Sequence, residues 1–212
     1  MGSRIMHVII ANGIAEKLSI HDKTSFLLGA VAPDAVHSKK EKGTSHFYAG
    51  TTKNYTRRID YDSFFHKYES HIDSPFVLGY YTHLIADDNW LSGFFLPWLK
   101  NRIENDETIA PLYYNDFKLL NAKLLHHYDK EQQLFSLLNQ DAHIVDIEEV
   151  SKENVSEFRK YLFEDMLYPE QHLHEDLQVF TFEQIVGYIE TAIEKGVFFI
   201  KQLSNEKSTS KI

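Results

Sequence analysis

The chain of 212 residues contains no cysteine, only five prolines and only nine glycines. Without cysteine, neither a disulfide framework nor a thiolate zinc site can form. Proline and glycine are too scarce for a collagen-like or low-complexity chain. The remaining composition, 43% hydrophobic and 25% charged, is that of an ordinary globular protein, and the length suits a single domain.

Positive charge is also in short supply. Lysine and arginine number 22 against 31 aspartates and glutamates, which gives a formal net charge of -9. This balance disfavours stable binding to nucleic acid or to anionic membranes.

The most apolar stretch, residues 76–99, contains a histidine and two aspartates, so we predict no membrane span. Polar residues interrupt the apolar run at residues 5–15, which therefore does not have the form of a signal peptide, and we expect a cytoplasmic protein.

Apolar residues recur at intervals of three and four along most of the chain, and strand-like alternation is almost absent. The predicted helices cover residues 6–18, 25–31, 62–72, 75–100, 116–128, 130–138, 151–167 and 181–203. Residues 32–61 lack a sustained period and are expected to form a long loop. We therefore predict an all-α, single-domain, multi-helix fold over residues 1–203, followed by a polar, disordered tail at residues 204–212.

Capping residues support several of these helix starts. Asp62 has the side chain to cap the helix that follows it. Ser74 with Pro75 forms a pair typical of the cap and first position of a helix. Thr181 and Gln184 have the spacing of a capping box. These signals place the start of the longest predicted helix at Ser74 and that of the last one at Thr181.

One side of the longest predicted helix combines aromatic residues with a histidine and an aspartate. Spacings of 4, 3, 4, 3 and 4 define this stripe: Phe76, Tyr80, His83, Asp87, Trp90 and Phe94. A carboxylate buried in such a stripe needs a cation, a metal ion or several hydrogen bonds. Residues four apart on a helix can reach one ion, so His83 and Asp87 are candidate metal ligands. The alternative is a core histidine hydrogen-bonded to the aspartate.

Three further candidates lie outside this helix. His7 opens the first predicted helix among apolar residues, Asp34 follows a Gly-Ala-Val-Ala-Pro segment, and His46 lies within Gly-Thr-Ser-His-Phe-Tyr. Each also has an ordinary interpretation: a histidine at a helix start can bond a backbone carbonyl, and an aspartate in a loop is commonly a turn residue. Taken singly, none of the three identifies a site.

The other histidines favour surface positions. Those on polar helix faces or at helix ends are His66, His71, His126 and His127. His172 or His174 could supply an extra ligand, although an acidic surface loop is the simpler interpretation. The pair His21-Asp22 has the form used by HD-type phosphohydrolases but lacks an apolar surrounding.

The order of these motifs resembles that of the zinc-dependent phospholipase C family, which is related to the S1/P1 nucleases. The segments that carry the resemblance are MHVIIANGIAEKL, LLGAVAPDA, SHFY and GYYTHLIADDNW, within residues 5–96. The resemblance implies an all-helical fold of the phospholipase C/P1 nuclease type with closely spaced zinc ions. His7 would then bind one ion, His46 and His83 the other, and Asp87 would bridge them. Asp34 would hold or deprotonate the attacking water.

The sequence departs from this family at the third zinc ion. The family has a further histidine ten residues after the one matching His83, and this chain has Gly93 there. We therefore expect two divalent metal ions, zinc before iron, manganese or nickel. The expected function is phospholipase C-like hydrolysis of phosphate esters, either small esters or phospholipid-type substrates. The alternative is a non-catalytic helical binding module with a structural or decayed metal site.

Overall fold

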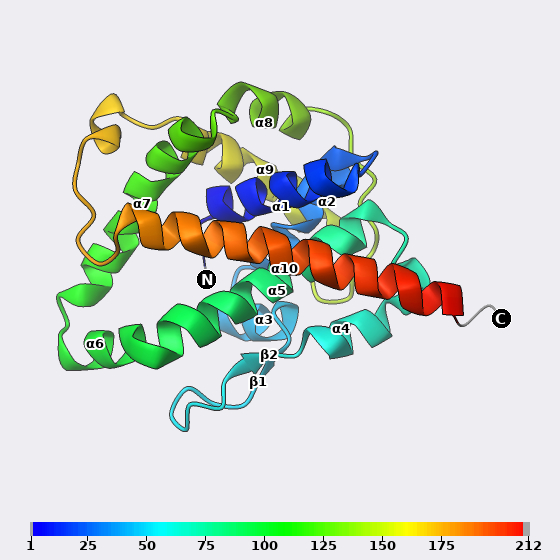
Figure 1. Cartoon of the computed structure of the whole chain (residues 1–212), viewed down its shortest axis with the longest axis horizontal. Coiled ribbons are helices and arrows are strands. Elements are labelled where there is room, and N and C mark those ends of the chain that lie inside the picture. Colours follow the sequence, from blue (N-terminus) through cyan, green and yellow to red (C-terminus); the bar gives the residue numbers. More distant parts are fainter. Residues whose placement is uncertain (1, 210–212) are drawn as a thin grey trace.

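The computed structural model describes residues 2–209, and 70% of it is helix against 3% strand (Figure 1). The all-α prediction is therefore confirmed. The helices are α1 (Arg4–Leu18), α2 (Lys23–Gly29), α3 (Lys39–Ser45), α4 (Tyr61–Lys67), α5 (Pro75–Trp90), α6 (Lys100–Asn105), α7 (Ile109–Tyr128), α8 (Glu131–Leu138), α9 (Lys152–Met166) and α10 (Phe182–Thr209). The short 3-10 turns are η1 (Ala32–Asp34), η2 (Glu69–His71) and η4 (Glu170–Leu173), and η3 (Leu91–Leu99) is a π-helix. One small antiparallel hairpin pairs β1 (Tyr48–Ala49) with β2 (Arg58–Ile59).

Helix α1 lies at the centre of the packing. It contacts α2, α5, α7, α9 and α10, and residues 5–12 are all buried. The Ser3 hydroxyl accepts a hydrogen bond from the backbone N–H of Met6 at 3.2 Å and so caps its start. Helix α10 runs across α1 and α5 on the side facing the viewer in Figure 1. Because α1 is buried on all sides, apolar residues lie on every face of its segment 5–12.

The backbones of α2 and α5 are in direct contact because both helices carry glycine where they cross. A Cβ atom added to Gly79 would lie 2.0 Å from the carbonyl oxygen of Phe26, and one added to Gly29 would lie 2.0 Å from that of Phe76. Both distances are far below any real Cβ contact. Only glycine therefore permits this approach, which brings the end of α2 beside the next turn of α5.

One capping prediction is confirmed and a second is confirmed in part. At the start of α10, the Thr181 hydroxyl accepts from the Gln184 N–H at 3.2 Å, and the Gln184 side chain accepts from the Thr181 N–H at 3.0 Å. Pro75 is the first residue of α5, as predicted, but the Ser74 side chain makes no capping hydrogen bond.

The prediction of one long loop over residues 32–61 is wrong, because the segment contains η1, α3 and the β-hairpin. Helix α3 starts with a capping box that we did not predict, although Ser38 and Glu41 have the S-x-x-E spacing of this motif. The Ser38 hydroxyl accepts from the Glu41 N–H at 3.2 Å, and the Glu41 carboxylate accepts from the Ser38 N–H at 2.9 Å. The strands have two residues each, which is too short to produce a period of two.

The boundaries of helix α4 also differ from the prediction. Asp60, rather than Asp62, caps it by accepting from the Ser63 N–H at 3.3 Å. The helix ends at Lys67, and the 3-10 turn η2 leads to the buried Ile72.

Other helix ends shift as well. The predicted helix that ends at Lys100 divides into α5, the π-helix η3 and α6, with Pro97 inside the π-helix. Helix α7 begins at Ile109, ahead of the predicted start at Asp116. Helix α10 extends through residues 204–209, which we had predicted to belong to the tail, and residues 210–212 lie outside the described part of the chain.

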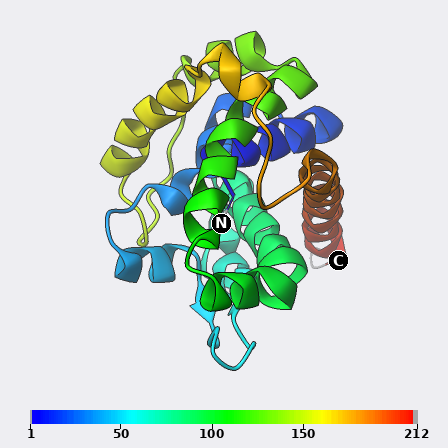
Figure 2. The ribbon, with the colours of Figure 1, turned by 90° about the vertical axis from the view of Figure 1, so that its left-hand side faces the viewer.

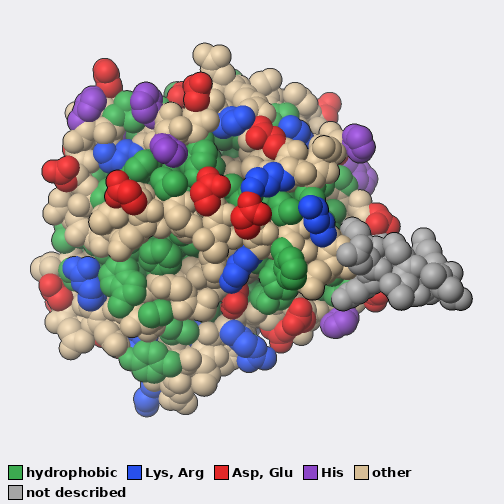
Figure 3. Space-filling model, viewed as in Figure 1, with side chains coloured by type: hydrophobic (Ala, Val, Ile, Leu, Met, Phe, Trp, Pro, Cys, Tyr) green, Lys and Arg blue, Asp and Glu red, His purple; other side chains and the backbone are tan. Residues whose placement is uncertain are grey.

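None of the helices in the described chain combines the length and the hydropathy that crossing a membrane requires. The face of the molecule in Figure 3 carries acidic and basic side chains interspersed among small hydrophobic areas, with several histidines at the surface.

Candidate metal centre

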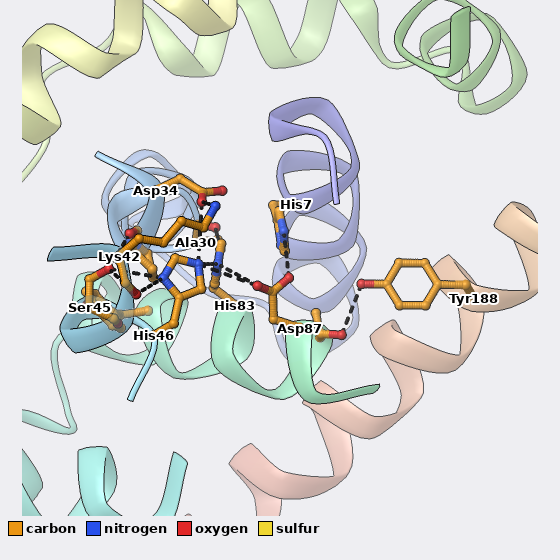
Figure 4. Close-up of polar contacts among 12 residues, drawn as sticks. His7, Ala30, Asp34, Lys42, Ser45, His46, His83, Asp87 and Tyr188 are labelled. Atoms are coloured by element: carbon orange, nitrogen blue, oxygen red, sulfur yellow. Dashed lines mark hydrogen bonds and ion pairs between the residues drawn. The ribbon is translucent and has the colours of Figure 1, made fainter. Parts of the chain in front are cut away.

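The fold brings together all five residues that the sequence nominated as metal ligands (Figure 4). His7 comes from α1, Asp34 from η1, and His46 directly follows α3. His83 and Asp87 lie one turn apart on α5. Within residues 2–209, these side chains form two groups that could each hold a metal ion. The first group is His7, His83 and Asp87, and the second is Asp34, His46 and His83.

The Asp87 carboxylate lies between the imidazoles. Its Oδ1 is 3.3 Å from Nε2 of His7, while its Oδ2 is 3.5 Å from Nε2 of His46 and 3.7 Å from Nε2 of His83. The two oxygens therefore face different histidines. This is the arrangement expected of a carboxylate that bridges two adjacent ions.

Backbone carbonyls determine where the protons of two imidazoles lie. Nδ1 of His83 is 2.8 Å from the carbonyl oxygen of Ala30, and Nδ1 of His46 is 3.0 Å from that of Lys42. A carbonyl can only accept, so each ring carries its proton on Nδ1 and a lone pair on Nε2. These two Nε2 atoms are 3.3 Å apart. Two neutral rings in this form cannot donate to one another, so the two Nε2 atoms face a position that a metal ion or a proton could occupy.

Buried hydrogen bonds hold His46 in this position. The hydroxyl of Ser45 donates to the carbonyl of Pro33 at 2.7 Å, which ties the end of α3 to η1. The hydroxyl of Tyr80 donates to the carbonyl of Ser45 at 2.6 Å, which ties the same point to α5. The aromatic stripe of α5 thus supports the site as well as the core.

The ring of His7 stacks on that of His83, with centroids 3.9 Å apart and planes inclined by 19°. Nδ1 of His7 is buried and has no hydrogen-bond partner among the described residues. The N-terminal segment covers this ring closely, since a Cβ atom on Gly2 would lie 3.3 Å from Nε2 of His7.

The electrostatics of the centre favour ionised carboxylates and neutral imidazoles. Burial acts to raise the pKa of Asp34 and of Asp87. Neighbouring polar and positive groups nevertheless hold both pKa values well below the ordinary range. For Asp34, these groups include His46 and Lys42. Burial lowers the pKa of His46 and, more strongly, that of His83. Two buried negative charges thus meet imidazoles that resist protonation.

Lys42 is the functional neighbour that the sequence did not single out. Its Nζ donates to Oδ1 of Asp34 at 2.6 Å. Burial acts to lower the pKa of Lys42, but the charge of Asp34 raises it above its ordinary value. The sequence offered only a lysine cluster in a supposed loop, and nothing local indicated which lysine faces the site.

The other histidines and aspartates considered as possible ligands lie outside the candidate metal centre. The exposed histidines are His21, His37, His66, His71, His126, His127, His143 and His174. Asp22 caps α2 by accepting from the Ser25 N–H at 3.0 Å, so the adjacent His-Asp pair has a structural role. His172 lies in η4, beside α7, and the possible metal-binding groups of the described chain include neither it nor His174. Asp88 accepts from the Ile59 N–H at 3.0 Å and fastens β2 to α5.

The centre is accessible at one ligand. The side chain of Asp34 is 12% exposed, whereas those of His7, His46, His83 and Asp87 are at most 1% exposed. Asp34 also lines a cavity of about 460 Å³. A small molecule in that cavity would meet the centre at Asp34.

Comparison with known proteins finds no match: no family model, curated protein or solved structure is similar to this chain.

Proposed function

We propose that this protein is a hydrolase of phosphate esters that works with two divalent metal ions, zinc before iron, manganese or nickel. The observation that carries the proposal is the approach of two Nε2 atoms to 3.3 Å, on rings whose other nitrogen lies at hydrogen-bond distance from a backbone carbonyl. Asp87 lies against this pair with one oxygen and against His7 with the other. The order of the motifs, which resembles that of zinc-dependent phospholipases C, supports the same function.

The donor set fits such ions. Three imidazoles and two carboxylates, without sulfur, suit zinc and the other divalent metals of this class. His46 and His83 would hold one ion together with Asp34, and His7 the other, with Asp87 shared. When bound, two adjacent cations polarise phosphoryl oxygens and lower the pKa of a water from about 15.7 toward 7.

The residues of the chain supply the remaining parts of the reaction. Asp34, the ligand at the cavity, can accept a proton from the attacking water or orient it. Lys42 holds that carboxylate in place through its 2.6 Å hydrogen bond and adds a positive charge beside the position of the phosphate. The buried supports from Ser45 and Tyr80 keep His46 fixed, so the site needs little rearrangement.

The test combines metal analysis with activity. We expect close to two metal ions per purified chain and hydrolysis of at least one class among phosphomonoesters, phosphodiesters, phospholipids and nucleotides, assayed with zinc, manganese and iron. Asp87→Asn should abolish this activity, because an amide bridges two cations poorly. His66→Ala, which alters an exposed histidine on α4, is the control. Circular dichroism verifies that both variants fold.

A structural metal site in a binding module is the second candidate. Burial of four of the five candidate ligands favours a structural site, because structural metal sites are closed whereas catalytic sites keep an open coordination position. A protein that contains both metals but hydrolyses none of these substrates would support this candidate and contradict the hydrolase.

A further inference from the structure

The cavity at Asp34 lies between the start of α1, the η1–α3 region, α7 and α9; we call it the α7 cleft. Its lining residues are Gly2, Ser3, Arg4, Asp34, Val36, Lys42, Tyr114, Phe117, Lys118, Asn121, Phe158 and Asp165. Figure 2 views the molecule from the side of α7, with the N-terminus close to that helix. Asp34 and Lys42 form the end of the cleft that leads to the metal centre.

One face of α7 forms the opposite wall. Tyr114, Phe117, Lys118 and Asn121 follow at intervals of three and four, so all four lie on the same side of the helix. Asn121 is only 8% exposed, and its Oδ1 is buried without a hydrogen-bond partner among the described side chains and backbone. A buried polar atom without a partner costs about 1–3 kcal/mol. A ligand that donates a hydrogen bond to Asn121 would remove this cost.

The charges of the cleft leave one cation for a ligand. Arg4 binds both oxygens of Asp165, at 2.7 and 2.9 Å, and Lys42 binds Asp34. Lys118 has no ion-pair partner among residues 2–203, whose side chains the structure describes. An anionic group in the cleft would therefore meet Lys118, which is free to bind it, together with Lys42, which also binds Asp34.

The size of the cleft limits the ligand. A volume of about 460 Å³ is in the lower part of the range for small-molecule pockets, roughly 300–1,000 Å³. Phe117 and Phe158 supply apolar wall, and Tyr114, which is 66% exposed, stands at the rim. A compact polar molecule fits this space, whereas two acyl chains do not.

We infer that the α7 cleft is the substrate pocket and that it selects a compact, water-soluble phosphate monoester. The phosphate lies toward Asp34, between Lys42 and Lys118, and a hydroxyl or amine of the alcohol portion donates to Asn121. A monoester is favoured because the cleft has room for one small substituent on the phosphate, whose charge faces Lys118, the cation of the cleft that is not already paired. This inference rests on the proposed hydrolase function, and Asn121 and Lys118 are its specificity-determining residues.

Binding measurements test the cleft independently of turnover. Titration calorimetry on the metal-loaded protein would use inorganic phosphate, glycerol 3-phosphate and dihexanoylphosphatidylcholine. Asn121→Ala should weaken glycerol 3-phosphate about tenfold and leave inorganic phosphate unchanged, because only the ester has an alcohol portion that can extend from the phosphate position to the amide. Lys118→Ala should weaken both about tenfold. Asn115→Ala, on the exposed side of the same helix, is the matched control.

The outcomes separate the two proposals. If Asn121→Ala and Lys118→Ala behave like Asn115→Ala in a protein that hydrolyses esters, the cleft assignment is wrong and the hydrolase stands. Tighter binding of the phospholipid than of glycerol 3-phosphate would also overturn it. If the cleft variants lose binding as expected but the wild type hydrolyses no ester, the hydrolase is wrong and the cleft remains a phosphate-binding site. Lys118 is exposed, so its variant tests the cleft even if Asn121→Ala unfolds.

Discussion

Replacement of Gly79 by alanine tests whether the contact between α2 and α5 positions the metal centre. The added Cβ would lie 2.0 Å from the carbonyl oxygen of Phe26, whereas real Cβ contacts are essentially never under 3.0 Å. The two helices must therefore separate by about 1 Å. Ala30, at the end of α2, moves with them.

The size of the effect follows from this displacement. A shift of about 1 Å would stretch the 2.8 Å contact between Ala30 and Nδ1 of His83 beyond hydrogen-bond length. Strain from overpacking costs about 1–3 kcal/mol, and the lost hydrogen bond about 1–2 kcal/mol. The higher helix propensity of alanine returns about 1 kcal/mol. We expect a net destabilisation of about 1–4 kcal/mol and a 10- to 100-fold loss of metal affinity, which is typical when a ligand loses its orienting partner.

The assay is thermal unfolding combined with zinc titration of the chelated protein. At about 2–4 °C per kcal/mol for a chain of this size, the melting temperature should fall by roughly 2–16 °C. Gly187→Ala is the control, because nothing lies within 4 Å of a Cβ atom at this position on α10. It should stabilise the protein by about 0.5–1 kcal/mol without changing zinc affinity. Equal behaviour of the two variants would refute the positioning role of the α2–α5 contact.

Three further predictions concern stability. Chelation should lower the melting temperature. An ion that binds only the folded state, present at a free concentration of 100 times its Kd, raises the free energy of unfolding by about 2.7 kcal/mol. An unchanged melting curve after verified metal removal would contradict a buried metal centre. The metal-free protein should lose stability as pH falls below about 6.5. The pKa values of His46 and His83 are lowered in the folded state, so the unfolded chain takes up protons first. Denaturant midpoints at pH 7.5 and 5.5 measure this loss of stability, and equal midpoints at the two pH values would contradict it. Asp116→Asn should destabilise by at least about 2 kcal/mol in urea, since its buried carboxylate accepts three backbone N–H groups, from residues 178–180, at 2.8–3.1 Å; Asn115→Ala should change little, and equal midpoints would disprove this role.

Local periodicity predicted the parts of the site that one helix contains. His83 and Asp87 are buried together because a spacing of four places them on the same face of α5, among the aromatic residues that drive its burial. The long helices were predictable for the same reason. Their ends were less so, because Asp60 and Asp62 are equivalent as capping residues until the tertiary structure selects one.

The parts that depend on distant contacts were not predictable from local pattern. The selection of Lys42 as the partner of Asp34 follows from the short helix α3, whose position depends on the hydrogen bonds of Ser45 and Tyr80. The π-helix η3 was not predicted either, although Pro97 within it indicates that a regular α-helix is interrupted there. His7 and His46 were nominated by the order of motifs and not by spacing.

The orientation of the His46 and His83 imidazoles, two candidate ligands, has a genetic consequence. Their second nitrogens bond to main-chain carbonyls, those of Ala30 and Lys42, and a carbonyl is present whatever side chain the codon specifies. No point mutation at these two positions deletes the acceptor. The charge contributed by the Lys42 side chain can therefore drift or be engineered separately from the geometry of His46, whereas an insertion or deletion that shifts the backbone of α3 would disturb both at once.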